Sequence, residues 1–368
     1  MRVSSAASGE PDLNVRPSGA TDRRRLQSVE VEPSPLALPR RVIGVAASAG
    51  GLEALQRLVA ALPADLDAAL CVVLHIPPTG RSLLAPILDR GSALPAAVAE
   101  DGAPLQGGMI YVAPPDHHLL VRRWVIELSR GPKENGVRPA ADPMFRSLAG
   151  SWGDRAVAVV LSGALDDGAA GTVAIAQAGG QVLVQDPADA VVAGMPSSAL
   201  AVTTPDEVLP IDALGGALVR VARAPVTNPG EEPDIPAEPD PADRERGPNR
   251  QPGPASGFTC PECSGALWEL REGEQVRYRC RVGHAYSADA MIEAQGSAVE
   301  AALWTALEVL EERSERLQRI ADRMYGKPRT QQRFSQGARD AAERAAVIRR
   351  VLRSGGSNTG LSRVEESA

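Results

Sequence analysis

Short apolar runs alternate with helical patterns between residue 41 and about residue 224. The apolar runs at 42–46, 69–74, 156–161 and 181–184 predict buried strands. Each is followed by a stretch with helical spacing, at 52–62, 82–88, 169–178 and 196–202. Strands that alternate with helices are typical of a doubly wound, mostly parallel α/β sheet. Between the two halves, the runs at 109–113, 119–122 and 124–128 predict a hairpin inserted at one edge of the sheet.

The rest of the chain divides into tails, a linker, a small module and a helical region. Residues 1–40 are rich in Ser, Pro, Arg and Glu without periodicity, which predicts a disordered tail. Residues 225–256 carry nine prolines among acidic and small residues, as in a flexible, extended linker. A Cys/His module at 257–290 follows. Apolar residues at three- and four-residue spacing then predict a helical hairpin at 291–353, before a polar tail at 354–368.

Charge and composition narrow the function classes. Hydrophobic residues make up 43% and charged residues 23% of the 368, as in globular proteins. A formal net charge of −7 argues against binding nucleic acid, which needs a basic face. The apolar runs are too short to span a bilayer, so we expect no direct membrane insertion. Three cysteines lie close to a histidine in the sequence and Cys71 stands alone, which favours metal binding over disulfides. Cysteines without disulfides are consistent with a cytoplasmic location, which we expect for this chain.

Three strand ends supply side chains that could work together. Ser48 follows the first predicted strand in a Gly-Gly turn, at the edge of the sheet where α/β folds place ligands. His75 ends the second predicted strand, and Asp167 follows the strand at 156–161. An acid at that edge can orient an imidazole, which in turn can take a proton from a hydroxyl. A nucleophile, a base and an orienting acid at three separate strand ends indicate a serine hydrolase.

Each of these residues also has an ordinary structural interpretation. The Ser48 turn is compatible with a phosphate loop or a plain tight turn. A histidine in a loop is more often a structural hydrogen-bond partner. Asp166 or Asp167 could simply cap the helix that begins near Gly168.

The stretch from residue 41 to about 222 resembles the catalytic domain of the CheB family, the bacterial chemotaxis protein-glutamate methylesterases. The resemblance rests on several motifs in the right order: 43–51 (IGVAASAGG), 74–78 (LHIPP), 111–118 (YVAPPDHH), Arg138-Pro139 with Asp142 and Phe145, 160–163 (VLSG) through 167–171 (DGAAG), and 194–196 (GMP). It implies that Ser48 is the nucleophile and His75 the base. It also implies that Asp167, rather than Asp166, is the acid.

The chain departs from the family pattern in three places. The family usually has threonine where this chain has Ala49, and Gly-Met-Gly where it has Gly163-Ala164-Leu165. The backbone N–H groups of Ala49 and Ala164 are candidate oxyanion donors, and such donors tolerate side-chain changes. Family members also commonly carry an N-terminal receiver domain, which residues 1–40 are too short to form, so we expect no control by phosphorylation of this chain.

The resemblance implies hydrolysis of glutamyl methyl esters on a methylated chemoreceptor or related sensory protein. Deamidation of a receptor glutamine is a second candidate reaction, and no cofactor takes part in catalysis. All three triad residues precede the predicted linker, so a piece ending near Ala224 is expected to keep the activity. The rival hypothesis is a non-catalytic signalling adaptor that uses the same α/β domain to bind receptors.

The Cys/His module has the ligand set of a structural metal site. Cys260 and Cys263 form one knuckle, and Cys280 and His284 form another. Three thiolates and one imidazole at this spacing predict a closed, tetrahedral zinc site in a zinc-ribbon-like module. Arginines at 271, 277, 279 and 281 add local positive charge, but the surrounding acidity argues against nucleic-acid binding. The Ala-rich stripe of the following helices suggests partner docking, unless the intramolecular hairpin buries it.

Overall fold

The structure is a computed structural model of the whole chain, and it describes residues 39–80, 82–226, 253–272 and 275–355. The predicted N-terminal tail, most of the proline-rich linker and the predicted C-terminal tail lie outside the described residues.

The α/β part of the chain is organised around a sheet of seven strands, all pairing in parallel, in the order β3-β4-β2-β1-β7-β8-β9. The strands are β1 (Arg41–Ala47), β2 (Ala68–Leu74), β3 (Ala96–Val98), β4 (Ile110–Val112), β7 (Ala156–Val160), β8 (Gln181–Gln185) and β9 (Glu207–Leu209). In β1, Ile43 and Val45 face one hydrophobic core while Val42 and Ala46 face the other. The central strands of the sheet are therefore buried on both faces, which is why they read as continuous apolar runs.

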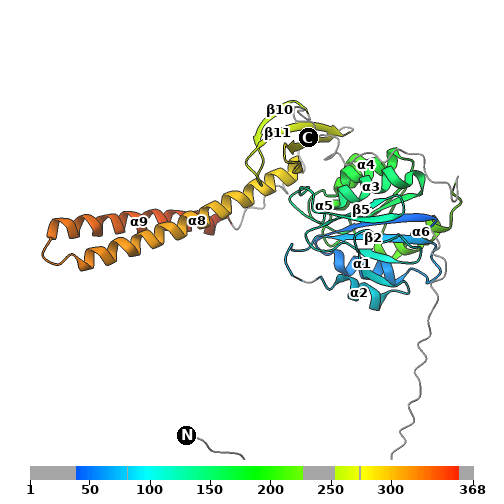
Figure 1. Cartoon of the computed structure of the whole chain (residues 1–368), viewed down its shortest axis with the longest axis horizontal. Helices are drawn as coiled ribbons and strands as arrows, with labels where there is room; N and C mark the ends of the chain where they lie inside the picture. Colours follow the sequence, from blue (N-terminus) through cyan, green and yellow to red (C-terminus); the bar gives the residue numbers. More distant parts are fainter. Residues whose placement is uncertain (1–38, 81, 227–252, 273–274, 356–368) are drawn as a thin grey trace, which may run out of the picture. The chain divides into compact units, whose positions relative to one another are not determined.

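Two helical layers cover the sheet (Figure 1). The helices of this α/β part are α1 (Gly51–Ala60), α2 (Leu84–Gly91), α3 (Ala141–Trp152), α4 (Ala169–Gln177), α5 (Gly194–Val202) and α6 (Ile211–Arg223), with a short 3-10 turn η1 (Gly153–Arg155) after α3. Side chains of α1, α2 and α6 fill one core, and those of α3, α4 and α5 fill the other. The doubly wound α/β fold expected from the sequence is confirmed.

One detail of the expected topology is wrong. The run at 109–113 is not part of an inserted hairpin, because β4 lies inside the main sheet between β2 and β3. The hairpin consists of β5 (His118–Arg122) and β6 (Val125–Ser129) alone, which form a separate two-stranded sheet. Its apolar side chains, such as Leu119 and Ile126, pack into the core that α3 fills. Sequence periodicity identifies strands but does not say which sheet they join.

The C-terminal part contains a small sheet and a helical hairpin. The sheet is antiparallel, with β10 (Ala255–Thr259), β11 (Ala266–Glu272), β12 (Gln275–Cys280) and β13 (Ala285–Ser287) in that order. Helix α8 (Ala288–Arg323) begins directly after β13, where the Ser287 hydroxyl accepts a hydrogen bond from the Ala290 N–H at 3.0 Å. Helix α9 (Pro328–Gly355) returns along α8, and the Ser314 hydroxyl donates to the Ala338 carbonyl at 2.9 Å.

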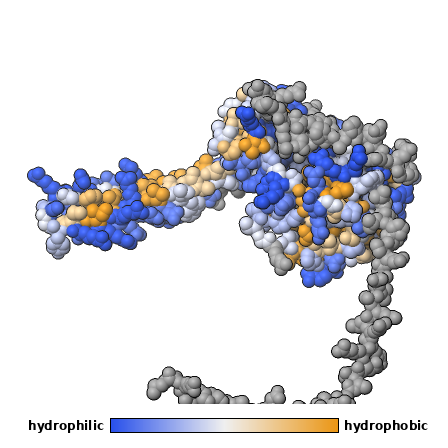
Figure 2. All heavy atoms as spheres, in the orientation of Figure 1, coloured by the Kyte–Doolittle hydropathy of each residue, from blue (hydrophilic) through white to orange (hydrophobic). Residues whose placement is uncertain are grey.

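The hairpin buries an alanine-rich seam but leaves larger apolar side chains outside. Ala321, Ala338, Ala341 and Ala345 are buried. Val299, Trp304 and Val309 are each more than half exposed on α8. The space-filling view accordingly shows apolar patches among the charged residues of the two helices (Figure 2). Among the described helices, none combines the length and apolar character needed to cross a bilayer.

Candidate active site

Ser48 is held by a tight turn between β1 and α1. Its N–H donates to the Ser162 carbonyl at 3.0 Å, which ties it to the loop after β7. Gly50 has a φ of 71°, and a Cβ there would lie 2.6 Å from Val191. The turn therefore needs glycine for both its backbone conformation and its packing.

His75 lies beside Ser48 because their strands are neighbours. Strands β1 and β2 pair in parallel register, with Ala47 opposite Leu74, so the residues that follow emerge at the same edge. The His75 Nδ1 atom lies 3.1 Å from the Ser48 hydroxyl. The His75 side chain is 14% exposed, so the pair is partly open to solvent.

Asp167 completes the set from the other side of β1, in the loop after β7. Its Oδ2 atom accepts a hydrogen bond from His75 Nε2 at 2.7 Å, and its side chain is only 2% exposed. Asp166, the neighbouring acid, is not hydrogen-bonded to the histidine, and its Oδ1 atom has no hydrogen-bond partner among the described residues. The structure thus brings Ser48, His75 and Asp167 together as a triad.

The histidine ring is used in a defined orientation. With Nε2 donating to Asp167, the neutral ring keeps its lone pair on Nδ1, which faces the hydroxyl of Ser48. In the serine-protease template the two ring nitrogens have the opposite partners. The chemistry is the same in both cases, because one nitrogen accepts the serine proton while the acid stabilises the imidazolium.

The Asp167 carboxylate is surrounded by donors. Oδ2 also accepts the Ala141 N–H at 2.6 Å, while Oδ1 accepts the Asp142 N–H and the Asn135 Nδ2 amide, both at 3.3 Å. Burial alone would raise the pKa of Asp167, but the hydrogen bonds from His75, Ala141 and Asp142 outweigh it and lower the pKa below its ordinary value. Asp167 is therefore ionised, as an orienting acid must be.

Asp142, a residue of the motif that begins with Arg138-Pro139, has a structural role next to the triad. Its Oδ1 atom accepts the N–H groups of Gly168 and Gly171 at 3.1 and 2.8 Å. These are orphan donors at the start of α4, so Asp142 of α3 caps that helix. The alternative that Asp166 or Asp167 caps it is wrong, because the cap comes from a residue 26 positions earlier in the chain.

An apolar hollow of about 280 Å³ lies beside the histidine. Leu74 and Ile76, the neighbours of His75 in sequence, form part of its wall, together with Leu83 and Ile87 from the region of α2. Leu83 is 66% exposed at this rim. The end of β2 that leads into His75 is thus bordered by an apolar surface.

The two candidate oxyanion donors lie on loops next to the triad. Ala49 follows Ser48, and Ala164 follows Gly163, whose backbone is so close that a Cβ there would lie 2.9 Å from the Cβ of Ser48. Over the described part of the chain, the backbone N–H groups of Ala49 and Ala164 donate no hydrogen bond to the protein. Their role toward a substrate stays a prediction.

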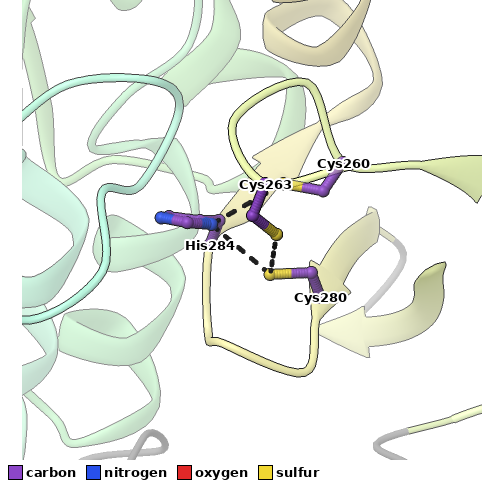
Figure 3. Close-up of side chains that lie close together, drawn as sticks. All are labelled: Cys260, Cys263, Cys280 and His284. Atoms are coloured by element: carbon purple, nitrogen blue, oxygen red, sulfur yellow. Dashed lines mark hydrogen bonds between the residues drawn. The ribbon is translucent and has the colours of Figure 1, made fainter. Parts of the chain in front are cut away.

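The four predicted metal ligands converge in the C-terminal module (Figure 3). Their ligand atoms all lie within 4.8 Å of one another. His284 Nδ1 lies 3.6 Å from the Cys260 sulfur and 3.5 Å from the Cys280 sulfur, and the sulfurs of Cys263 and Cys280 are 3.6 Å apart. Tetrahedral zinc bonds of about 2.3 Å to sulfur and 2.0–2.1 Å to nitrogen require separations of about 3.8 and 3.6 Å, respectively. The observed cluster fits such an ion.

The fold and the triad together define this part of the chain as an α/β protein with the constellation of a serine hydrolase. Comparison with known proteins gives the family. The family model described as CheB methylesterase matches residues 43–218. The segment that carries the triad is therefore a CheB methylesterase catalytic domain, as the sequence motifs indicated.

Individual relatives agree with that assignment. A Caulobacter vibrioides protein named protein-glutamate methylesterase/protein-glutamine glutaminase 2 is 40% identical over 191 residues, which are 50% of this chain and 55% of that one. A Methanosarcina acetivorans protein of the same name is 38% identical over 193 residues, 50% of this chain and 54% of that one. The chain thus spans little more than half the length of these relatives. The crystal structure of the Thermotoga maritima CheB methylesterase catalytic domain is 32% identical to this chain in sequence. The alignment covers 98% of that structure's chain and 49% of this one, with a TM-score of 0.48.

Proposed function

We propose that this protein hydrolyses glutamyl methyl esters on other proteins through a covalent Ser48 intermediate. The observation that carries the proposal is the hydrogen-bonded series from Ser48 through His75 to the buried carboxylate of Asp167. The names of the Caulobacter and Methanosarcina relatives specify the same reaction for those proteins.

The reaction follows from the geometry. The Ser48 oxygen attacks the ester carbonyl while His75 Nδ1 takes the hydroxyl proton, and Asp167 stabilises the resulting imidazolium. The imidazolium then protonates the leaving methoxide, and methanol departs from a glutamyl-enzyme. Water hydrolyses that ester with His75 again acting as the base. The N–H groups of Ala49 and Ala164 would stabilise the oxyanion in both steps.

The substrate class follows from the family resemblance. A methylated chemoreceptor or related sensory protein is the expected partner, and a receptor glutamine is the second expected substrate. Amide hydrolysis needs the same nucleophile, with ammonia as the leaving group. The intact triad is what favours an enzyme over a non-catalytic adaptor, since binding a receptor requires no paired Ser48 and His75.

The test uses the purified full chain and membranes containing methylated receptors of its source organism. Methanol and ammonia release are measured in parallel, with unmethylated receptor as the control substrate. The proposal predicts methanol only from methylated receptor, and ammonia from receptor that carries glutamine at those positions. Stable receptor binding without release of either product would favour the adaptor instead.

We also propose that Cys260, Cys263, Cys280 and His284 bind one structural zinc ion. Four protein ligands leave no open coordination position, and the module's own core is small, with Leu267 and Tyr286 its main fully buried side chains. Elemental analysis of protein purified without chelator should find about one zinc per chain. A Cys263→Ser variant should lose it, whereas a Cys71→Ser variant should keep it. An unchanged zinc content in Cys263→Ser would refute the site.

The proposed setting is the cytoplasm, where a reducing environment keeps cysteines as thiols. All four cysteines are free in the structure. We propose that the exposed apolar residues of α8, including Trp304 and Val309, provide the contact for a protein partner. Loss of partner binding in a Trp304→Ser variant, with intact helicity by circular dichroism, would support this.

A further inference from the structure

The C-terminal module contacts a loop of the catalytic domain at residues 132–135. The Asn135 N–H donates to the Ala285 carbonyl at 2.7 Å, and the Ala285 N–H donates to the Lys133 carbonyl at 3.3 Å. Residues 133–135 thereby extend β13 as a short parallel bridge. Nearby, Gly283 lies so close to Pro132 that a Cβ on the glycine would be 2.7 Å from the proline ring.

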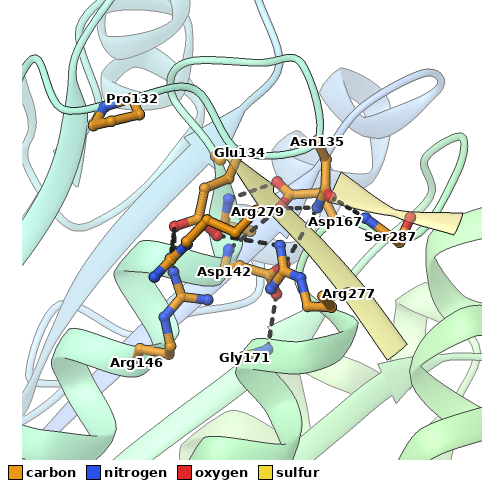
Figure 4. Close-up of polar contacts among 12 residues, drawn as sticks. Pro132, Glu134, Asn135, Asp142, Arg146, Asp167, Gly171, Arg277, Arg279 and Ser287 are labelled. Atoms are coloured by element: carbon orange, nitrogen blue, oxygen red, sulfur yellow. Dashed lines mark hydrogen bonds and ion pairs between the residues drawn. The ribbon is translucent and has the colours of Figure 1, made fainter. Parts of the chain in front are cut away.

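A buried arginine of the module pairs with two acids of the catalytic domain (Figure 4). The Arg277 side chain on β12 is 3% exposed. Its Nη1 atom lies 3.0 Å from Asp142 Oδ2, and its Nη2 atom lies 3.2 Å from Glu134 Oε2. Glu134 is also paired with Arg146 of α3. Two of the arginines that add positive charge to this segment, Arg277 and Arg279, are thus buried against Glu134 rather than exposed to solvent.

Asn135 links the module directly to the triad. Its Oδ1 atom accepts the backbone N–H of Ser287 at 3.1 Å, where β13 ends. Its Nδ2 amide donates to Asp167 Oδ1 at 3.3 Å and to Asp142 Oδ2 at 3.2 Å. The Ser287 N–H fixes which end of the amide is the oxygen, so the amide nitrogen must face the carboxylate of the catalytic acid.

We propose that Arg277 is a positioning residue for the triad, holding Asp142 and the Asn135 amide in the arrangement that orients Asp167 toward His75. The proposal rests on the proposed esterase function of the same site. It assigns the C-terminal module a part in the active site itself. It therefore conflicts with the expectation from the sequence that a piece ending near Ala224 keeps the activity.

The charges around Asp142 explain how Arg277 acts. Burial raises the pKa of Asp142 to about 7; Arg277 and Arg146 oppose that rise, and the carboxylates of Asp167 and Glu134 add to it. Without Arg277 the pKa of Asp142 would be higher still, and the group would take up a proton at neutral pH. A neutral carboxyl accepts hydrogen bonds more weakly. The Asn135 amide would then lose one of the two oxygens that hold it against the triad.

The experiment measures how fast Ser48 in the full chain reacts with a fluorophosphonate. In this reaction the Ser48 oxygen bonds to phosphorus, fluoride leaves, and His75 takes the hydroxyl proton. The rate therefore reports on the triad without any receptor substrate. The proteins compared are wild type, Arg277→Met, Arg277→Lys and Arg271→Met, from pH 6 to pH 9. Arg271 is an exposed arginine of the same module, so Arg271→Met is the matched control.

The proposal predicts that Arg277→Met slows labelling about 10- to 100-fold at pH 7. Its rate should recover as the pH rises and Asp142 ionises, and Arg277→Lys should be intermediate because the ammonium keeps the charge. Arg271→Met should match wild type. A folded Arg277→Met with the wild-type rate and pH profile would overturn the proposal, and so would faster labelling, which would make the module an inhibitor.

Two further comparisons keep the result interpretable. If Arg277→Met does not fold, Arg277→Lys alone is decisive, since one ammonium cannot pair with both acids as the guanidinium does. It should label at least about threefold more slowly than wild type, and an unchanged rate would refute the proposal. Labelling that depends on Arg277 without any methanol release would refute the proposed substrate but not this inference. Methanol release with labelling independent of Arg277 would refute this inference but not the proposed substrate.

Discussion

Replacing Asp167 with asparagine tests the triad most informatively, because the new amide cannot satisfy the surroundings of the old carboxylate. The carboxylate accepts from His75 and Ala141 at one oxygen and from Asn135 and Asp142 at the other. Asparagine has only one oxygen. Whichever way it turns, its NH₂ group faces donors on one side.

Both orientations of that amide have a calculable effect. If the NH₂ group faces His75, the ring must accept at Nε2 and carry its proton on Nδ1, so it cannot take the proton of Ser48. The corresponding change in a serine protease lowers kcat about 10⁴-fold, equivalent to about 5.5 kcal/mol of transition-state stabilisation. If the NH₂ group faces Asn135 and the Asp142 N–H, buried donors are left without an acceptor, which costs about 1–3 kcal/mol of folding free energy.

The assay is methanol release at saturating substrate, together with urea unfolding of the same proteins. Asp166→Asn is the matched control, since Asp166 is a buried acid one position away that does not contact His75. We expect a loss of about 10⁴-fold in kcat for Asp167→Asn and less than tenfold for Asp166→Asn. Comparable losses in the two variants, or a larger one at Asp166, would refute the assignment of the acid.

Two other predictions concern stability. Glu134→Gln should destabilise the protein by about 3 kcal/mol at neutral pH, because it removes the buried carboxylate that pairs with both Arg146 and Arg277. Burial alone would raise the pKa of Glu134, but the three arginines around it and His118 lower that pKa to about 2. The difference in unfolding free energy between wild type and variant, measured with urea, should therefore hold above about pH 4.5 and close as the pH falls through about 2. A pH-independent difference would contradict this. Leu165→Gly should leave stability unchanged or raise it by up to about 1 kcal/mol, because Leu165 has a φ of 61°, which costs a non-glycine residue about 1–2 kcal/mol. Val309→Gly, at an exposed position of α8, should instead lose about 0.5 kcal/mol, and a similar loss at both sites would show that the Leu165 backbone is not strained.

The sequence was sufficient for the parts of the site that depend on local pattern. Ser48, His75 and Asp167 each follow a buried apolar run, and parallel strands bring their carboxyl ends to one edge. The Cys/His cluster was equally visible, because two short Cys/His knuckles need only a hairpin to meet.

The residues that sequence reasoning missed act over long distances in the chain. Asn135 lies in an irregular loop with a φ of 52°, and nothing in its neighbourhood marks it as a partner of Asp167. Arg277 reads as one of several arginines in an acidic segment, and its burial becomes apparent only when β12 lies against Glu134, 143 positions earlier. The proline-rich linker gave no sign of this contact, because a flexible connection permits docking without specifying it.

Leu165 illustrates a departure whose consequence is structural. The family pattern has glycine at this position, and the left-handed backbone of Leu165 supplies the physical reason for that preference. Sequence comparison could flag the substitution but not its cost, because the cost depends on the φ angle of the folded loop.

The most direct test of the account is methanol release by the full chain and by its Ser48→Ala variant, at equal concentration and on the same methylated receptor. Only a half-buried hydroxyl at a strand-end turn is removed, so the variant should keep its unfolding midpoint and zinc content. We expect its kcat to fall by at least about 10⁴-fold, as for the loss of a nucleophile in other serine hydrolases. Wild-type methanol release by a folded Ser48→Ala protein would contradict the central claim.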